Sequence, residues 1–163
     1  MEIRKVKADE IDRVMEIYAY ARKFQAEHGN PNQWTGGYPQ REIVERDQEN
    51  GELYCVTPDG DQGTICGVFM FSGRPEPDYT VIEGHWKNQE PYSVIHRVAS
   101  DGTHRGVGKA CIDWAFSRHA NLKMDTHEDN TVMQNMLIKN GFTYCGVVHI
   151  RGGETRLAYQ KTR

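Results

Sequence analysis

The sequence of 163 residues has no long apolar run, and its first ten residues lack the apolar core of a signal peptide. We therefore expect no segment that crosses a bilayer, and we expect a cytoplasmic protein. The cysteines show no C-x-x-C spacing, and each lies in an apolar strand or helix pattern. The favoured interpretation is buried free thiols at positions 55, 66, 111 and 145.

Low-complexity segments, repeat periods and an excess of basic charge are also missing. Charged residues make up 26% and hydrophobic residues 37% of the chain, which argues against a disordered or solenoid protein. The net charge is −3, and lysines and arginines alternate with carboxylates, so we expect no nucleic-acid partner. The length fits one compact domain, which we place at residues 1–163.

The periodicity of apolar residues predicts strands first and then a strand–helix–strand order. The predicted strands cover residues 2–7, 52–57, 63–72, 93–100, 122–126, 143–150 and 154–161. The predicted helices cover residues 9–27, a segment after Pro39, and residues 106–120 and 130–139. Asp9 is a candidate cap of the first helix, and Gly152-Gly153 predicts a hairpin between the last strands. The pattern indicates a mixed sheet with helices on both faces, in the α/β or α+β class.

The most informative segment is 94–116, where an apolar strand pattern passes through a Gly-rich turn into an amphipathic helix. A helix start leaves main-chain N–H groups without partners and carries a partial positive charge. Gly106 and Gly108 remove the Cβ atoms that would hold a ligand away, while Arg105 and Lys109 add positive charge. These features predict an anion site, with a pyrophosphate as the expected occupant.

Two common Gly-rich patterns fit this turn poorly. A P-loop needs glycine five positions before Gly108 and a hydroxyl after the lysine, but Thr103 and Ala110 occupy those positions. A dinucleotide fingerprint needs a third small residue where Cys111 stands, together with a strand–helix–strand unit near the start of the chain.

The segment Thr103-His-Arg-Gly-Val-Gly108 instead resembles the R/Q-x-x-G-x-G/A motif of the GNAT acetyltransferases, with Thr at its first position. We expect Arg105 to take part of the role of that first residue. Downstream, Asn130 and the Gly-Phe pair that ends at Phe142 match the N…GF spacing common in these proteins. The resemblance spans most of the chain. It implies an α/β (α+β) fold with a mixed, mostly antiparallel sheet, helices on both faces and a splayed central strand pair.

The resemblance also implies direct transfer of an acetyl group from acetyl-CoA to an amine, with no metal and no covalent intermediate. Such a reaction needs alignment of the amine and polarisation of the thioester carbonyl. In GNAT proteins the strand before the turn binds the thioester and pantetheine, the turn binds the pyrophosphate, and the asparagine contacts the pantetheine arm. The resemblance carries these roles to Val98, Ala99 and Ser100, to Arg105, Gly106, Val107, Gly108 and Lys109, and to Asn130, respectively.

An alkyl amine is almost entirely protonated at pH 7, so a base or a water relay is useful. His96 lies on the strand beside the expected thioester and is the candidate base, although strand alternation alone could aim it at either face. The other interpretation of His96 is a partly buried strand histidine. Asp125 and His127 are weaker candidates for the same role.

The position at which the family often carries a tyrosine acid holds Leu137. The leaving thiolate must then take its proton from another residue or from water, or leave unassisted. Tyr144 and Cys145 are substitutes to consider, but a place in the strand core or on the surface explains both at least as well.

The acceptor site is expected between the first two helices and the loop that precedes residue 93. Trp34 and Tyr38 lie in a Gly- and Pro-rich connection, where they could wall the pocket or anchor the loop on the core. The loop 73–92 is mildly acidic, which favours a cationic amine. The carboxylates there are Glu76, Asp78, Glu83 and Glu90, against Arg74 and Lys87.

The family resemblance leaves the acceptor open between a small-molecule, amino-acid or peptide amine, and it allows a homodimer through the hairpin 143–161. Two other classes stay open. One is an acyl-CoA-binding sensor or structural module without catalysis, for which Leu137 is the main support. The other is a nucleotide-phosphate binder, against which the missing P-loop hydroxyl argues.

Overall fold

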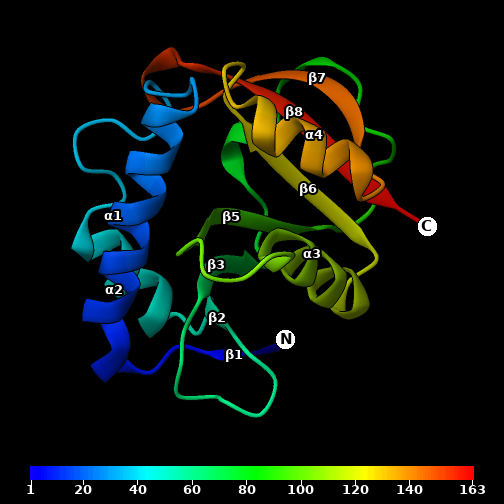
Figure 1. The fold of residues 1–163 in the computed structure, drawn as a ribbon. Helices are drawn as coiled ribbons and strands as arrows, with labels where there is room; N and C mark the ends of the chain where they lie inside the picture. The colour runs from blue at the N-terminus through cyan, green and yellow to red at the C-terminus, as the bar shows by residue number, and fades with distance from the viewer.

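The structure, a computed structural model, describes all 163 residues, and its strands form one eight-stranded sheet (Figure 1). The strand order is β1-β2-β3-β5-β6-β8-β7-β4. Every neighbouring pair is antiparallel except β5 and β6, which are parallel. The strands are β1 (Glu2–Lys5), β2 (Leu53–Thr57), β3 (Gly67–Ser72), β4 (Ile82–Gly84), β5 (Ser93–Ser100), β6 (Asn121–Thr126), β7 (Thr143–His149) and β8 (Thr155–Thr162).

Two helices lie on each side of the sheet, as Figure 1 shows. Because side chains alternate along a strand, neighbouring residues of β3 belong to different layers. Val68 packs with α1 and α2, while Phe69 packs with α3 and α4. The α-helices are α1 (Ile11–Glu27), α2 (Arg41–Glu49), α3 (Val107–Arg118) and α4 (Thr131–Lys139), and the short 3₁₀ helices are η1 (Ala8–Glu10), η2 (Pro77–Tyr79) and η3 (Arg151–Gly153). No helix is long and apolar enough to cross a membrane.

The parallel strands β5 and β6 separate soon after they meet. They pair only at Ser93 with Leu122 and at Val94 with Lys123. On its other side β5 carries a bulge against β3, where Arg97 adopts a positive φ of 53°. The splayed central pair that the family resemblance implies is therefore confirmed, and it opens a gap in the middle of the sheet.

The loop 73–92 contains two elements that periodicity did not reveal, η2 and β4. β4 pairs with β7 over three residues, so it covers part of the edge of the final hairpin. Gly84 and Gly146 allow this close pairing, because a Cβ on Gly84 would lie 2.2 Å from the carbonyl oxygen of Cys145. A three-residue strand is too short to produce a repeating apolar signal, which explains why the sequence analysis read this segment as a loop.

Asp9 does not cap the first helix, which corrects that expectation. Residues Ala8–Glu10 form η1, and the carboxylate of Glu10 accepts the N–H of Lys7 at 2.9 Å. Arg4 on β1 fixes this carboxylate through two hydrogen bonds of 2.9 and 2.8 Å. An arginine of the preceding strand, six positions before Glu10, therefore determines which acid sits at the helix start. The four cysteines are buried and unpaired, as predicted.

Candidate active site

Two cavities meet where the sheet splays. The larger has a volume of about 520 Å³ and lies between the α1–α2 connection, the η2 loop and the β7–β8 turn. The smaller, of about 300 Å³, lies between the C-terminal part of α1 and the starts of α3 and α4. Gln25, Val98, Asn130 and Met133 line both cavities. Ligands bound in the two cavities would therefore come together at the gap between β5 and β6.

The smaller cavity has apolar walls that are open to solvent. Tyr20, Phe24 and Val132 line it and keep 45%, 36% and 51% of their surface exposed. Met133 and Met136 of α4 also line it. Large apolar side chains that gather in one exposed groove commonly mark a ligand site.

The start of α3 lies at one end of this groove and offers free main-chain donors. The N–H groups of Val107, Gly108 and Lys109 have no hydrogen-bond partner, and no side chain caps the helix. Gly106 adopts a φ of 80° at the N-cap, a conformation that favours glycine. Arg105 is exposed, whereas Lys109 forms an ion pair with Asp113 one turn further on.

The turn before α3 is fixed by a residue that the sequence analysis missed. Asp101 accepts the main-chain N–H of Thr103 at 3.0 Å and a guanidinium N–H of Arg13 at 2.6 Å. Arg13 lies on α1, 88 positions earlier in the chain, so no local pattern could indicate the contact. This ion pair ties the Gly-rich turn to α1.

Asn130 lies at the junction of the cavities but already uses its side chain within the protein. Its Oδ1 accepts the N–H of Met133 at 3.0 Å, which caps α4, and its Nδ2 donates to Gln33 Oε1 at 3.1 Å. The same Gln33 oxygen accepts the Nδ2 of Asn30 at 2.9 Å. These amides link the α1–α2 connection to α4 beside the splay. The contact of Asn130 with the pantetheine arm stays a prediction.

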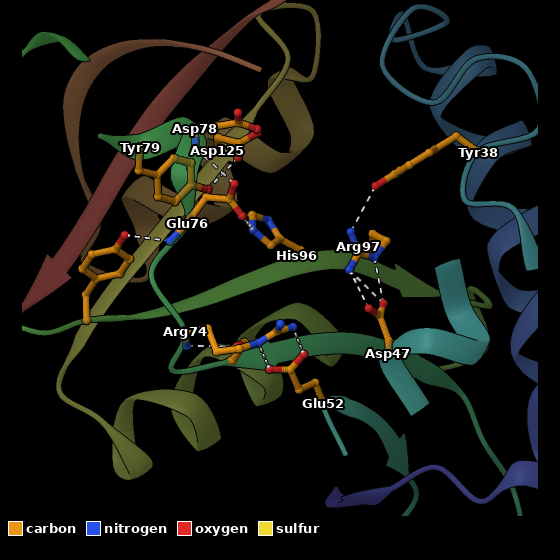
Figure 2. Close-up of polar contacts among 12 residues, drawn as sticks. Tyr38, Asp47, Glu52, Arg74, Glu76, Asp78, Tyr79, His96, Arg97 and Asp125 are labelled. Carbon is orange, nitrogen blue, oxygen red and sulfur yellow. Dashed lines mark hydrogen bonds and ion pairs between the residues drawn. The ribbon is translucent and has the colours of Figure 1, made fainter. Parts of the chain in front are cut away.

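His96 faces the larger cavity, and Figure 2 shows its ring directed at Glu76. Their Nε2 and Oε2 atoms are 3.2 Å apart. Glu76 is itself held in place, since its Oε1 accepts the N–H of Asp78 at 3.2 Å and its own N–H donates to the Tyr92 hydroxyl at 2.9 Å. The hydrogen bond from His96 lowers the pKa of Glu76, although burial opposes this shift.

The contact with Glu76 determines which nitrogen of His96 can act as a base. An ionised carboxylate can only accept hydrogen bonds, so the Nε2 atom must carry the proton in this contact. In the neutral ring the other nitrogen, Nδ1, is then unprotonated, and it has no other hydrogen-bond partner. The role of His96 as a base stays a prediction, and the structure shows only that the residue lines the cavity and keeps one ring nitrogen without a partner.

Two further carboxylates lie beside this pair, Asp78 and Asp125 (Figure 2). Asp125 accepts the Tyr79 hydroxyl at 2.6 Å. Burial raises the pKa of Asp78, and the neighbouring charges of Glu76 and Asp125 add to that rise. None of these carboxylates has a lysine or arginine within ion-pair distance, although Arg151 lines the same cavity and its charge lowers the pKa of Glu76 and Asp78.

Arg97 of β5 lines the larger cavity and links β5 to α2 and to the α1–α2 connection through hydrogen bonds. The sequence analysis missed this role. Its guanidinium donates to both oxygens of Asp47 at 2.9 Å and to the Tyr38 hydroxyl at 3.1 Å (Figure 2). Burial raises the pKa of Asp47, and Arg97 opposes this rise.

Trp34 is 8% exposed and packs in the core while also lining the cavity, as Tyr38 does. Both aromatics therefore anchor the loop and form part of the cavity wall.

We expect Asp47→Asn to lower the free energy of unfolding by about 2 kcal/mol, because it leaves the buried charge of Arg97 without its partner. Chemical denaturation measures this change. The matched control is Asp12→Asn, which removes an exposed carboxylate that pairs with Arg41. That control should leave stability unchanged. Equal stability of the Asp47 variant and the wild type would contradict the structural role of the pair.

The other candidate acids and bases lie away from the junction. Leu137 is fully buried in the core, and Tyr144 is half exposed on β7. Tyr144, Cys145 and His127 line neither of the two cavities described above. The His127 Nδ1 accepts the N–H of Asp129 at 3.0 Å. Among the predicted proton-transfer residues, only His96 and Asp125 lie in the cavity walls.

Several solved structures share this fold. A GNAT-family acetyltransferase of Streptococcus agalactiae is 32% identical, with a TM-score of 0.88 over 99% of this chain and 95% of that chain. A GNAT-family acetyltransferase of Listeria monocytogenes is 19% identical, with a TM-score of 0.72 over 98% and 93% of the two chains. The PaiA N-acetyltransferase of Thermoplasma acidophilum, solved in complex with coenzyme A, is 16% identical, with a TM-score of 0.66 over 99% and 98%. No family sequence model matches the chain, and no curated protein does.

Proposed function

Since the chain belongs to the GNAT acetyltransferase family, we propose that it transfers an acetyl group from acetyl-CoA directly to an amine. The observation that carries this proposal is the meeting of the two cavities at the splay. The smaller cavity is an apolar groove that leads to the free main-chain N–H groups of α3, which suits a long ligand with an anionic end. The other has a base and unpaired carboxylates, as a cationic acceptor requires.

The residues of the smaller cavity fit acetyl-CoA. The first-turn N–H groups of α3 and the exposed Arg105 suit a pyrophosphate. The apolar walls suit the body of a pantetheine arm, and beyond Val94 no strand pairs with β5 on the side that faces β6. When bound, acetyl-CoA supplies an acetyl thioester that is already activated. The proposed binding residues are Val98, Ala99, Ser100, Arg105, Gly106, Val107, Gly108, Lys109 and Asn130.

In the proposed mechanism, His96 removes a proton from the acceptor amine through its free Nδ1 atom. The carboxylate of Glu76 stabilises the positive charge that then develops on the ring. The neutral amine then forms a bond to the carbonyl carbon as the bond from that carbon to sulfur breaks, while main-chain N–H groups of β5 donate to the carbonyl oxygen. The departing thiolate takes its proton from water, because the buried Leu137 cannot supply one. Asp78 and Asp125 attract a cationic acceptor into the cavity, and Trp34 and Tyr38 wall it.

A second candidate function is acyl-CoA binding without catalysis. Leu137 favours it, because this buried apolar side chain cannot protonate a leaving thiolate. The contact between His96 and Glu76 favours catalysis, because it leaves one ring nitrogen free in the cavity. Turnover with any amine would exclude the binding module.

The first test is thermal stabilisation by acetyl-CoA, compared with ATP plus magnesium and with NAD. A ligand that binds only the native state raises its stability according to the ratio of concentration to dissociation constant. We expect a rise in Tm with acetyl-CoA alone, followed by release of free CoA when suitable amines are added. No shift with acetyl-CoA would contradict the proposal, and a shift with ATP alone would support the nucleotide-binding alternative.

A further inference from the structure

The larger cavity carries positive as well as negative charge, because three arginines line it. The bidentate contact with Asp47 already neutralises Arg97. The other two are Arg151, in the turn between β7 and β8, and Arg156, near the start of β8. A guanidinium is well suited to bind a carboxylate, because two of its N–H groups match the two oxygens. These two arginines therefore indicate an anionic group on the ligand of this cavity.

Arg156 is buried, with 5% of its surface exposed, and it uses only part of its hydrogen-bonding capacity. Nη1 donates to the carbonyl oxygen of Thr155 at 3.0 Å, and Nη2 donates to the exposed carboxylate of Glu154 at 3.1 Å and to the Gln33 carbonyl oxygen at 3.5 Å. Since a guanidinium has five N–H groups, the Nε group and one N–H of Nη1 lack a partner. The Nε atom keeps accessible surface. A ligand in the cavity that Arg156 lines is therefore the expected partner of these donors.

Arg151 is exposed, and its side chain forms no hydrogen bond or ion pair within the protein. Its guanidinium carbon lies 5.0 Å from the centre of the Tyr38 ring, and Tyr38 lines the same cavity. This contact with an aromatic face leaves the N–H groups at the edge of the guanidinium free. Arg151 is also close enough to Glu76 and Asp78 for its charge to act on both carboxylates. The cavity therefore holds a free cation and free carboxylates near one another.

Asp125 and Arg156 lie on neighbouring strands and on the same face of the sheet. Asp125 of β6 pairs in register with Ala158 of β8, so Arg156, two residues before Ala158, is its diagonal neighbour. The main chains at such positions are about 7–8 Å apart. Only the Oδ2 atom of Asp125 has a partner, the Tyr79 hydroxyl. A small molecule with an amine and a carboxylate a few bonds apart therefore matches the free groups of Asp125 and Arg156.

We propose that the acceptor is a free amino acid. Its amine faces His96, Asp78 and Asp125, and its carboxylate binds Arg151 and Arg156. The inference rests on the proposed function, because it names the class of acceptor for the same cavity. The bond from nitrogen to the acetyl carbon forms as the bond from that carbon to sulfur breaks. Overall, the ammonium form of the amino acid and acetyl-CoA give an N-acetyl amino acid, CoA as a thiol and one proton, and the substrate carboxylate is unchanged.

The test measures the release of free CoA from acetyl-CoA with matched acceptors. Each common L-amino acid is compared with its carboxamide, in which a neutral amide replaces the carboxylate, and spermidine serves as an acceptor with positive charge only. We expect at least one amino acid to react with a kcat/KM about tenfold or more above that of its carboxamide, because charge-assisted hydrogen bonds are the strong ones. Spermidine should react poorly, because it would place positive charge beside the arginines.

Arg151→Gln should raise the KM of that amino acid by about tenfold and lower its preference over the carboxamide by a similar factor. Because Arg151 is exposed, this variant should fold normally. Arg156→Lys keeps the buried charge but loses the planar fork, and it should also raise the KM. The matched control is Arg118→Gln, which should keep the preference of the wild type. Arg118 likewise lies over an aromatic ring, 4.9 Å from the centre of Trp114, but it is exposed and lines neither cavity.

Three results would overturn the inference. They are reaction of the carboxamides or spermidine alone, equal kcat/KM for amino acids and their carboxamides, and an unchanged preference in the Arg151 variant. Each of these would leave acetyl transfer to an amine intact. Failure of the wild type to bind acetyl-CoA, or no release of CoA with any acceptor, would instead contradict the proposed function itself.

Discussion

Gly108→Glu is expected to abolish CoA binding while the protein stays folded. Gly108 lies in the first turn of α3 and lines the smaller cavity. A glutamate there would place bulk and negative charge beside the free N–H groups that are proposed to bind the pyrophosphate. Juxtaposition of like charges at a binding site costs several kcal/mol, so CoA affinity should fall by at least about 100-fold. Calorimetric titration with CoA measures the loss.

The fold should tolerate this change, because a negative side chain in the first turn of a helix is favourable. The circular dichroism spectrum and the Tm of the variant would verify this. Gly108→Ala is the matched control, because the R/Q-x-x-G-x-G/A motif admits alanine at this position. Its Cβ would meet only the flexible end of Met136, at 3.1 Å, so CoA binding should stay largely intact. If the glutamate variant keeps its affinity for CoA, the proposed pyrophosphate site is wrong.

His96→Ala should lower kcat by a factor on the order of 10² to 10⁴, the usual contribution of a general base. Affinity for acetyl-CoA should change little, because the ring lines only the larger cavity. The measurement combines steady-state kinetics, on an amine identified by the ligand screen, with calorimetric titration of acetyl-CoA. A reduced kcat with unchanged cofactor affinity would separate proton transfer from cofactor binding.

His149→Ala is the matched control for this experiment. His149 makes a similar contact, with its Nε2 atom 3.0 Å from Glu83 Oε2, but it is exposed and lies outside both cavities. We expect normal kcat in this variant. Unchanged kinetics in the His96 variant would leave His96 as a structural residue of β5 and would require another route for the amine proton.

Local patterns predicted most of the fold correctly. The strand at 93–100 matches β5, and the helix predicted at 130–139 matches α4 to within one residue. These elements have strong local signals, such as the apolar β-type run of β5 and the asparagine cap of α4. The short strand β4 was missed because its three residues show no periodicity. It forms through close pairing of glycines with β7, some 60 positions further along the chain.

For the candidate site, the sequence named residues but could not place them. It identified His96 and Glu76, yet only the fold brings these two residues, 20 positions apart, into contact. It did not identify the buried pair of Asp47 and Arg97, because these residues are 50 positions apart and only the fold brings them together.

The amino-acid sequence by itself determined the order of the strands and helices other than β4 and the 3₁₀ helices, the Gly-rich start of α3 and the family resemblance, because these depend on residues close together in the chain. The tertiary structure decided which way His96 points, which carboxylate holds it and how the Gly-rich turn is anchored to Arg13. It also decided that two cavities meet at the splay. These features depend on packing between distant segments, which local propensity and periodicity do not encode.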